Sequence, residues 1–339
     1  MKSFLLMHQA FRGLLSAQTL ALPPPKHAWV RSIKIASKYH AYQKPYVRKP
    51  FESISGYMPK TVGTAKFFAG TVDNSHAMID FSSDAQIKTN IEMAQEKRVD
   101  VHDIRYMEPP ASLSVEGCEL VYSPTGLRES DLLNHSKDEV DATVKSSYFH
   151  ECANLVKRKT GASKAIPYNY RHRQLKEGEV LDSPDGYSSK PLVTFHMDND
   201  RETAEANLKR ALSPEEADYW LSRNWGIINV WRPIGDTVFQ YPLGLIDSTS
   251  ADLVHNAVPI FTKNNYKDHF TALRFDPNYR FYYASRLTPD EAMLFVDFDS
   301  KHSPGLSGLA HGAFRDHASP DNAPLRRSIE VRVLVLYDE

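Results

Sequence analysis

The chain has 339 residues, of which 41% are hydrophobic, and a formal net charge of −1. This length and apolar content are sufficient for one large domain with a substantial core. The near-zero net charge excludes a global field that would recruit nucleic acid, and no apolar run approaches the roughly 18 residues of a membrane-spanning helix. We therefore expect no nucleic-acid partner and no membrane span.

The N-terminal segment differs in charge from the rest of the chain. Residues 1–51 contain nine Lys or Arg and no acid, whereas the remainder has 32 basic and 42 acidic residues, a net charge of −10. An acid-free, basic opening is typical of a mitochondrial transit peptide, and a basic arm packed on an acidic body is the alternative. We expect residues 1–62 to form a basic extension and residues 63–339 to form a single domain.

The two cysteines, Cys118 and Cys152, fit neither a zinc-binding spacing nor a disulfide framework. This usage favours a reducing compartment. Cytoplasmic localisation is therefore the expectation, and the mitochondrion is the alternative that the basic N-terminal segment raises.

The first half of the chain contains one clear strand pattern and one long helix pattern. Residues 99–103 alternate between apolar and polar side chains, as in a strand. Residues 138–160 place apolar side chains at every fourth position, which predicts a helix that ends at Gly161. A polar loop is expected over residues 171–190.

The second half carries most of the strand patterns. Strands are expected over residues 193–197, 227–233, 281–283, 292–296 and 329–337. A helix is expected to begin at Pro214, with Ser213 as its N-cap. Several strands with long connections predict an α+β fold with a double-stranded β-helix, a jelly-roll or cupin-like core, and flanking helices.

A histidine and an aspartate two residues apart follow an apolar run. His196 and Asp198 come at the end of the strand expected over residues 193–197. On a strand, this spacing directs both side chains to one face. They would make two-thirds of the 2-His-1-carboxylate site that holds non-haem iron(II). His-x-Asp also occurs by chance in many surface loops, so the pattern becomes informative only with a third ligand.

The second histidine must come from later in the chain. The candidates are His255, His269, His302, His311 and His317. His311 stands among small and apolar residues, which suits a buried ligand, whereas His317 stands in a polar segment typical of an exposed turn. We expect His311 to complete the site. A surface position or a core position is the alternative for any of these histidines.

An arginine and a serine two residues apart open the last expected strand. Arg326 and Ser328 would share one face, while Arg327 would point to the other face, in phase with Ile329. A planar guanidinium binds a carboxylate with two parallel hydrogen bonds, and a nearby hydroxyl adds a third donor. The pair therefore suits the distal carboxylate of 2-oxoglutarate. A solvated basic pair at Arg326 and Arg327 is the alternative.

These residues also carry a resemblance to a known family. Over about residues 63–339 the chain resembles the fungal hydroxylase/desaturase family that includes gibberellin desaturase-like enzymes. The blocks that carry it are VHDIR (101–105), HMD (196–198), INVWRP (228–233), DPNYRFYY (276–283), LTPDE (287–291), FDSK (298–301), HGAF (311–314) and APLRRSIEVR (323–332). The resemblance implies the jelly-roll fold, iron ligands at His196, Asp198 and His311, and cosubstrate binding by Arg326. It does not extend to residues 1–62.

The INVWRP block and one tyrosine supply candidates for the pocket. Asn and Arg cost free energy when they are buried without partners. We therefore expect Asn229, Trp231 and Arg232 to line a substrate or cosubstrate pocket, together with Tyr282. Pairing of Arg232 with an acid such as Asp299 behind the site is the alternative, and core packing is the alternative for Tyr282.

The resemblance implies an iron(II)/2-oxoglutarate-dependent dioxygenase that requires iron(II), 2-oxoglutarate and O2. Its expected reaction is oxidation of an unactivated C–H bond of a small-molecule fungal secondary metabolite, by hydroxylation, desaturation or oxidative ring closure. A non-catalytic metal-binding jelly roll, or a scaffold whose basic arm binds a partner, is the alternative. The substrate and the oligomeric state stay open.

Overall fold

The structure of the chain is a computed structural model that describes residues 58–81, 88–133, 135–178, 181, 189–263, 269–301 and 308–338. All of these residues belong to one compact unit, Tyr42–Glu339. The basic segment over residues 1–57 lies outside the described residues, and the first strand begins at Lys60, ahead of the expected boundary at Gly63. Within the described ranges, no helix combines the length and hydropathy that crossing a bilayer requires.

The described strands form two sheets, of which the smaller has five antiparallel strands in the order β5-β13-β8-β16-β6. Its strands are β5 (Cys118–Tyr122), β6 (Lys164–Gln174), β8 (Trp225–Pro233), β13 (Glu291–Asp299) and β16 (Arg327–Leu336). Every residue of β8 and all but two of β16 are buried, as expected for strands in the interior of the sheet.

The larger sheet has eleven described strands in the order β15-β1-β4-β12-β9-β14-β7-β11-β10-β2-β3. Most of its pairs are antiparallel, and β10 with β2 and β12 with β4 are parallel. The strands are β1 (Lys60–Phe67), β2 (Met78–Asp80), β3 (Lys88–Thr89), β4 (Gln95–Asp103), β7 (His196–Met197), β9 (Leu243–Ile246), β10 (Ala257–Lys263), β11 (His269–Leu273), β12 (Phe281–Tyr283), β14 (His311–Ala313) and β15 (Arg315–Asp316).

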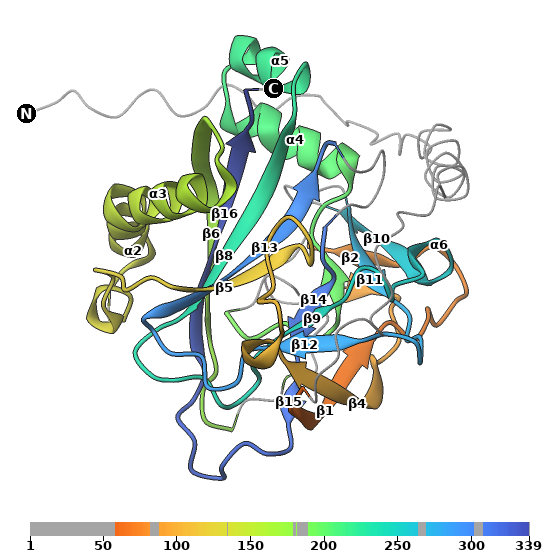
Figure 1. Cartoon of the computed structure of the whole chain (residues 1–339). Coiled ribbons are helices and arrows are strands. Elements are labelled where there is room, and N and C mark those ends of the chain that lie inside the picture. The colour runs from red at the N-terminus through yellow and green to blue at the C-terminus, as the bar shows by residue number, and fades with distance from the viewer. Residues whose placement is uncertain are drawn as a thin grey trace, which may run out of the picture. The chain divides into compact units, whose positions relative to one another are not determined.

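Helices flank this core, and α2 and α3 lie alongside β6 and β16 (Figure 1). The α-helices are α2 (Lys137–Thr143), α3 (Phe149–Thr160), α4 (Arg201–Ala211), α5 (Pro214–Leu221) and α6 (Leu253–Asn256). A π-helical turn, η4 (Val144–Tyr148), joins α2 to α3, and η2 (Ile104–Tyr106) and η3 (Glu129–Asp131) are short 3₁₀ turns. The expected ends are confirmed: Gly161 ends α3 with a φ of 70°, and the Ser213 hydroxyl accepts the Glu216 N–H at the start of α5.

Alternation along β16 separates two environments. The odd-numbered residues from Ile329 to Val335 pack with α3 in one buried cluster. The even-numbered Ser328, Glu330 and Arg332 point the other way, and Arg332 reaches Asp198, beside the larger sheet. A second apolar cluster joins the two sheets, with Trp231 and Phe295 from the smaller sheet and Leu245 from the larger one. The two facing sheets and their flanking helices form the expected α+β jelly roll.

Two expectations about local structure need correction. The strand expected over residues 193–197 is regular only at His196 and Met197, although Thr194 also bridges to Lys66. The polar loop expected from residue 171 begins as β6, which continues to Gln174. Every residue of β6 is polar or only partly buried, so the segment lacks the apolar alternation that identifies a strand in sequence.

Candidate metal centre

Two histidines from distant parts of the chain lie directly opposite each other. His196 on β7 pairs with His311 on β14 in antiparallel register. Directly opposite residues project to the same face of a sheet, and the two imidazole rings lie 4.5 Å apart between their centroids. The neighbours of His196, Phe195 and Met197, point to the other face and belong to an apolar cluster. Strand alternation thus fixes the direction of the histidines.

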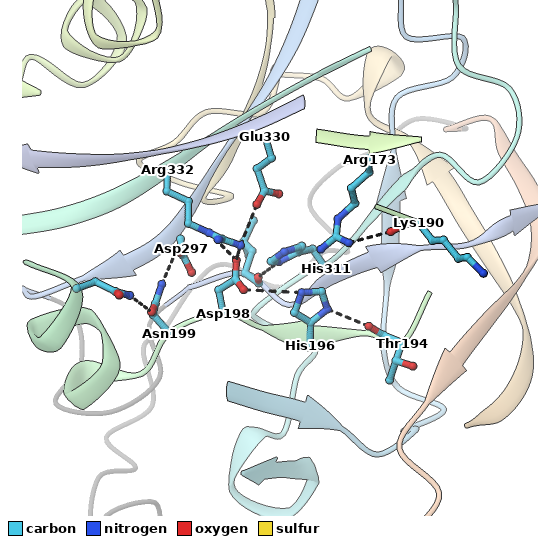
Figure 2. A network of polar contacts seen from close by, with 12 residues as sticks. Arg173, Lys190, Thr194, His196, Asp198, Asn199, Asp297, His311, Glu330 and Arg332 are labelled. Atoms are coloured by element: carbon cyan, nitrogen blue, oxygen red, sulfur yellow. Dashed lines mark hydrogen bonds and ion pairs between the residues drawn. The ribbon is translucent and has the colours of Figure 1, made fainter. Parts of the chain in front are cut away.

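Asp198 follows β7 and completes a group of three possible metal ligands. One ligand atom from each of His196, Asp198 and His311 lies within 4.8 Å of the others. The Nε2 atom of His196 is 4.0 Å from Oδ1 of Asp198. All three residues are buried, with exposed fractions of 6%, 7% and 4%. Figure 2 shows the three side chains turned toward one another. Two imidazoles and one carboxylate on one side are the donor set that iron(II) oxygenases use.

Backbone carbonyls orient both imidazoles. The Nδ1 atom of His196 is 2.9 Å from the Thr194 carbonyl oxygen, and Nδ1 of His311 is 3.0 Å from that of Leu309. A carbonyl oxygen only accepts, so each Nδ1 carries the hydrogen and each Nε2 presents a lone pair. Burial, with the neighbouring His311, lowers the pKa of His196 to about 3. The imidazole is therefore neutral, which is the form that binds a metal.

The carboxylate of Asp198 is held from the facing sheet by Arg332. Both Nη2 and Nε of Arg332 donate to Oδ2 of Asp198, at 2.5 and 3.1 Å. Nη2 also lies 3.1 Å from Oε1 of Glu330. Neither Arg332 nor Glu330 was expected at the site. The sequence pattern could have indicated them, because residues 328, 330 and 332 alternate along the last strand and therefore share one face.

Buried polar contacts fix the backbone that follows Asp198. The Asn199 amide donates to Asp297 at 2.6 Å and accepts from the Asn207 amide at 2.8 Å. Asp200 caps the N-terminus of α4, and its Oδ2 lies 2.9 Å from Nε2 of His269. These contacts anchor the chain on the carboxyl side of the aspartate, so its backbone has little freedom to move.

The structure separates His311 from the other candidate histidines. His269 is bound to Asp200, as described above, and His255 lies 2.7 Å from Asp252 at the surface. His317 is 2.8 Å from the Thr64 hydroxyl, outside the group of three. His302 lies outside the described residues.

A second cationic position lies at the start of β16. Arg326 is 4% exposed, its Nη1 donates to the Tyr241 carbonyl, and Nε and Nη2 are each 3.3 Å from the Ser328 hydroxyl. Its guanidinium lies 5.0 Å from the centroid of the Trp231 ring. Arg327 points the other way and forms ion pairs with Glu129 and Asp236. Arg326 is thus buried, and the alternative of a solvated pair is wrong.

Arg326 is attracted by the charge of Glu330 but is not in direct contact with it. In the described part of the chain it forms no ion pair with a carboxylate. Burial lowers its pKa, because the charged form is desolvated and Arg173 adds repulsion. A buried guanidinium without a counter-charge costs free energy, and a carboxylate ligand would remove that cost.

Arg173 is a further basic residue that sequence reasoning missed. It lies on β6 directly opposite Ser328, so its side chain shares the face of Ser328. Its Nη1 donates to the Lys190 carbonyl at 2.8 Å, a contact visible in Figure 2. Burial lowers the pKa of Arg173. It was missed because the polar strand that carries it was expected to be a loop.

Asn229 and Trp231 lie on the inner face of the smaller sheet. Asn229 is 0% exposed, and neither its amide nitrogen nor its amide oxygen has a hydrogen-bond partner among the described residues. It lies between Arg332 and Phe295 in register, and the Phe295 ring is 4.7 Å from that of His311. Buried polar atoms are almost always satisfied, so this amide fits a polar ligand at the centre.

Tyr282 shares the face of the two histidines. A row of directly opposed residues runs across the larger sheet, consisting of His102, Tyr282, Leu245, His311 and His196. Tyr282 therefore lines the inner face, two strands from His311. Its hydroxyl lies 3.4 Å from Oδ2 of Asp247.

Arg232 does not join the site, which corrects the expectation made for it. It lies opposite Ile329, on the face that packs against the helices. Its Nε donates to the Tyr148 hydroxyl at 3.1 Å and its Nη1 to the Pro289 carbonyl at 2.6 Å. Adjacent residues of a strand point to opposite faces, so Arg232 cannot share the pocket with Trp231. The alternative pairing with Asp299 is also absent from its described contacts.

Comparisons with known proteins identify the family of the chain. A family model described as an oxidoreductase/YMDC permease-like domain matches residues 66–336. Oxidoreductase clz16 from Cochliobolus lunatus is 34% identical over 290 residues, which are 82% of this chain and 97% of the relative. Hydroxylase/desaturase efuI from Hormonema carpetanum is 30% identical over 258 residues, 70% of this chain and 83% of the relative.

A further relative has a known structure, which supports the jelly-roll fold. The Fe(II)/2-oxoglutarate-dependent dioxygenase nvfI from Aspergillus novofumigatus is 30% identical over 242 residues, 70% of this chain and 82% of the relative. The structure of the iron and alpha-ketoglutarate-dependent endoperoxidase NvfI superposes with a TM-score of 0.68 at 26% identity, covering 83% of this chain and 99% of that one.

Fold and site together define a non-haem iron(II)/2-oxoglutarate-dependent dioxygenase, an enzyme that uses iron(II), 2-oxoglutarate and O2 and acts on a small molecule. The donor set of two neutral imidazoles and one carboxylate fits iron(II). This chain belongs to the fungal hydroxylase/desaturase family of such oxygenases.

Proposed function

We propose that the protein binds iron(II) through His196, Asp198 and His311 and oxidises an unactivated C–H bond of a fungal secondary metabolite by hydroxylation, desaturation or ring closure. The single observation that carries the ligand assignment is the convergence of three buried donor atoms within 4.8 Å. The substrate class is supported by the relatives, which include a hydroxylase/desaturase and an aspirochlorine biosynthesis protein.

Arg326 and Ser328 bind the distal carboxylate of 2-oxoglutarate in this proposal. The support is a buried guanidinium without a carboxylate partner in the described chain, beside a hydroxyl on the same strand face. Nη1 of Arg326 donates to the Tyr241 carbonyl, and Nε and Nη2 donate to the Ser328 hydroxyl, so the second N–H groups of Nη1 and Nη2 would bind the ligand. When bound, iron(II), 2-oxoglutarate and O2 supply the oxidising chemistry.

The other residues on the inner faces of the two sheets form the walls of the site and exclude water from it. Phe295 packs on the His311 ring and excludes water from one side of the metal ligands. Asn229 offers an amide donor and acceptor to the cosubstrate or the substrate, and its lack of a partner supports this role. Trp231 and Tyr282 form apolar and hydroxyl-bearing walls of the same space. A dry cavity of this kind strengthens each polar contact with the ligand.

A reducing compartment fits this activity, and we propose the cytoplasm. Cys118 and Cys152 are both buried, and neither forms a disulfide in the part of the chain that the structure describes. A fluorescent fusion of the full chain tests this, and an organelle pattern would contradict it.

Anaerobic titration with iron(II) and then 2-oxoglutarate tests the function. The wild type is expected to develop a weak visible charge-transfer band and, once O2 is admitted, to form succinate. His196→Ala should give no band, whereas His317→Ala should behave as wild type, because His317 contacts Thr64 instead. A wild type without the band, or a His196→Ala variant that keeps it, would contradict the proposal.

A further inference from the structure

The contact between Arg332 and Asp198 has an unusual asymmetry. An arginine fork commonly engages both oxygens of a carboxylate, one with each N–H. Here both Nη2 and Nε of Arg332 donate to the same oxygen, Oδ2, at 2.5 and 3.1 Å. The other oxygen, Oδ1, is the one 4.0 Å from Nε2 of His196. The two oxygens of Asp198 therefore have different surroundings, with Oδ2 toward Arg332 and Oδ1 toward the imidazoles (Figure 2).

Glu330 holds Arg332 in turn. Its Oε1 lies 3.1 Å from the same Nη2 atom that binds Asp198. The side chains of Asp198, Arg332 and Glu330 are 9%, 5% and 13% exposed, so all three pay a desolvation cost. A guanidinium between two carboxylates is compensated from both sides. These two contacts hold Arg332 in place before any metal binds.

The position of Arg332 on β16 limits its motion further. Arg332 lies opposite Asn229 on β8 and opposite Asn169 on β6, in the middle of the smaller sheet. Asp198, in contrast, lies beside the larger sheet and is 134 residues away in sequence. The contact thus links the two sheets at the metal centre, and a rigid strand carries the group that orients the ligand.

We propose that Arg332, fixed by Glu330, is a positioning residue that holds Asp198 as a one-oxygen metal ligand and so keeps further coordination positions open for the cosubstrate. This inference rests on the proposed ligand set. Arg332 donates two hydrogen bonds to Oδ2, and chelation of the metal by both oxygens would have to compete with them. Loss of Arg332 would let Asp198 rotate, bind with two oxygens or turn away from the histidines.

Binding of Co(II) to the metal-free protein tests the proposal, because its visible spectrum reports affinity and coordination number without turnover. Arg332→Gln is expected to bind Co(II) about 10–100-fold more weakly than wild type, the usual cost of losing an outer partner of a metal ligand. The spectrum of the loaded variant should also change. Arg327→Gln is the matched control: it lies on the same strand, faces Glu129, and should leave both readouts unchanged.

A positioning role and a purely electrostatic role of Arg332 predict opposite changes in Co(II) affinity when Arg332 is replaced. If Arg332 only repelled the cation, its removal would tighten Co(II) binding, and that result would overturn the proposal. Wild-type affinity with a wild-type spectrum in a folded Arg332→Gln protein would also overturn it. Glu330→Gln provides the same test if Arg332→Gln does not fold: weaker Co(II) binding supports the proposal, and wild-type binding overturns it. A wild type that binds no Co(II) would instead refute the ligand set itself.

Discussion

Replacement of Arg326 by methionine should weaken 2-oxoglutarate binding strongly, because it removes the buried charge that the cosubstrate would neutralise. Nη1 donates to the Tyr241 carbonyl and Nε and Nη2 donate to the Ser328 hydroxyl, which leaves the second N–H groups of Nη1 and Nη2 for the cosubstrate. Two charge-assisted hydrogen bonds are worth about 1.5–3 kcal/mol each. Their loss amounts to about 3–6 kcal/mol, or roughly a 10²–10⁴-fold increase in Kd.

The assay is anaerobic titration of the iron(II)-loaded protein with 2-oxoglutarate, followed by the visible band. Arg327→Met is the control, since that residue faces Glu129 and should leave the Kd unchanged. The melting temperature of both variants must also be measured to show that they are folded, because Arg326 packs over Trp231 and binds a backbone carbonyl. A folded Arg326→Met protein that binds 2-oxoglutarate as tightly as wild type would show that the cosubstrate carboxylate lies elsewhere.

Three further predictions address single contacts. Asn229→Leu should raise the melting temperature of the metal-free protein, because each buried amide atom without a partner destabilises the fold by about 1–3 kcal/mol. The same substitution should weaken cosubstrate or substrate binding. A lower melting temperature would contradict this prediction. Gly312→Ala should lower the free energy of unfolding by about 1–3 kcal/mol in a denaturant titration, because the added Cβ would lie 3.0 Å from Cδ2 of Phe195. An unchanged free energy of unfolding would show that the neighbouring side chain moves aside without strain. Arg105 binds Glu291 with two hydrogen bonds and lowers the pKa of that carboxyl below 4.5, so the stabilisation is complete above pH 4.5 and is lost as the pH falls through the lowered pKa. Arg105→Met should therefore make the free energy of unfolding less sensitive to acid. An unchanged dependence of stability on pH would contradict the pairing.

Period-two alternation made much of the centre predictable. His196 and Asp198 could be recognised from their spacing, and the phase of Ser328 against Ile329 followed from the pattern of the last strand. The same rule separates Arg232 from the pocket, because Arg232 is adjacent to Trp231 and therefore faces the helices.

Contacts between the two sheets could not be predicted in this way. Arg332 and Asp198 are separated by 134 residues and belong to different sheets, so no local pattern joins them. Arg173 was hidden for another reason, because β6 has no apolar alternation and is stabilised by pairing with β16. Tertiary pairing, and not intrinsic propensity, makes that segment a strand.

Anomalous diffraction at the iron edge, from anaerobic crystals grown with iron(II) and 2-oxoglutarate, tests the ligand set most directly. We expect one iron peak within bonding distance of Nε2 of His196, Nε2 of His311 and Oδ1 of Asp198, the three side chains that converge in this structure. A peak bound by other residues, or one in which Asp198 takes no part, would contradict it.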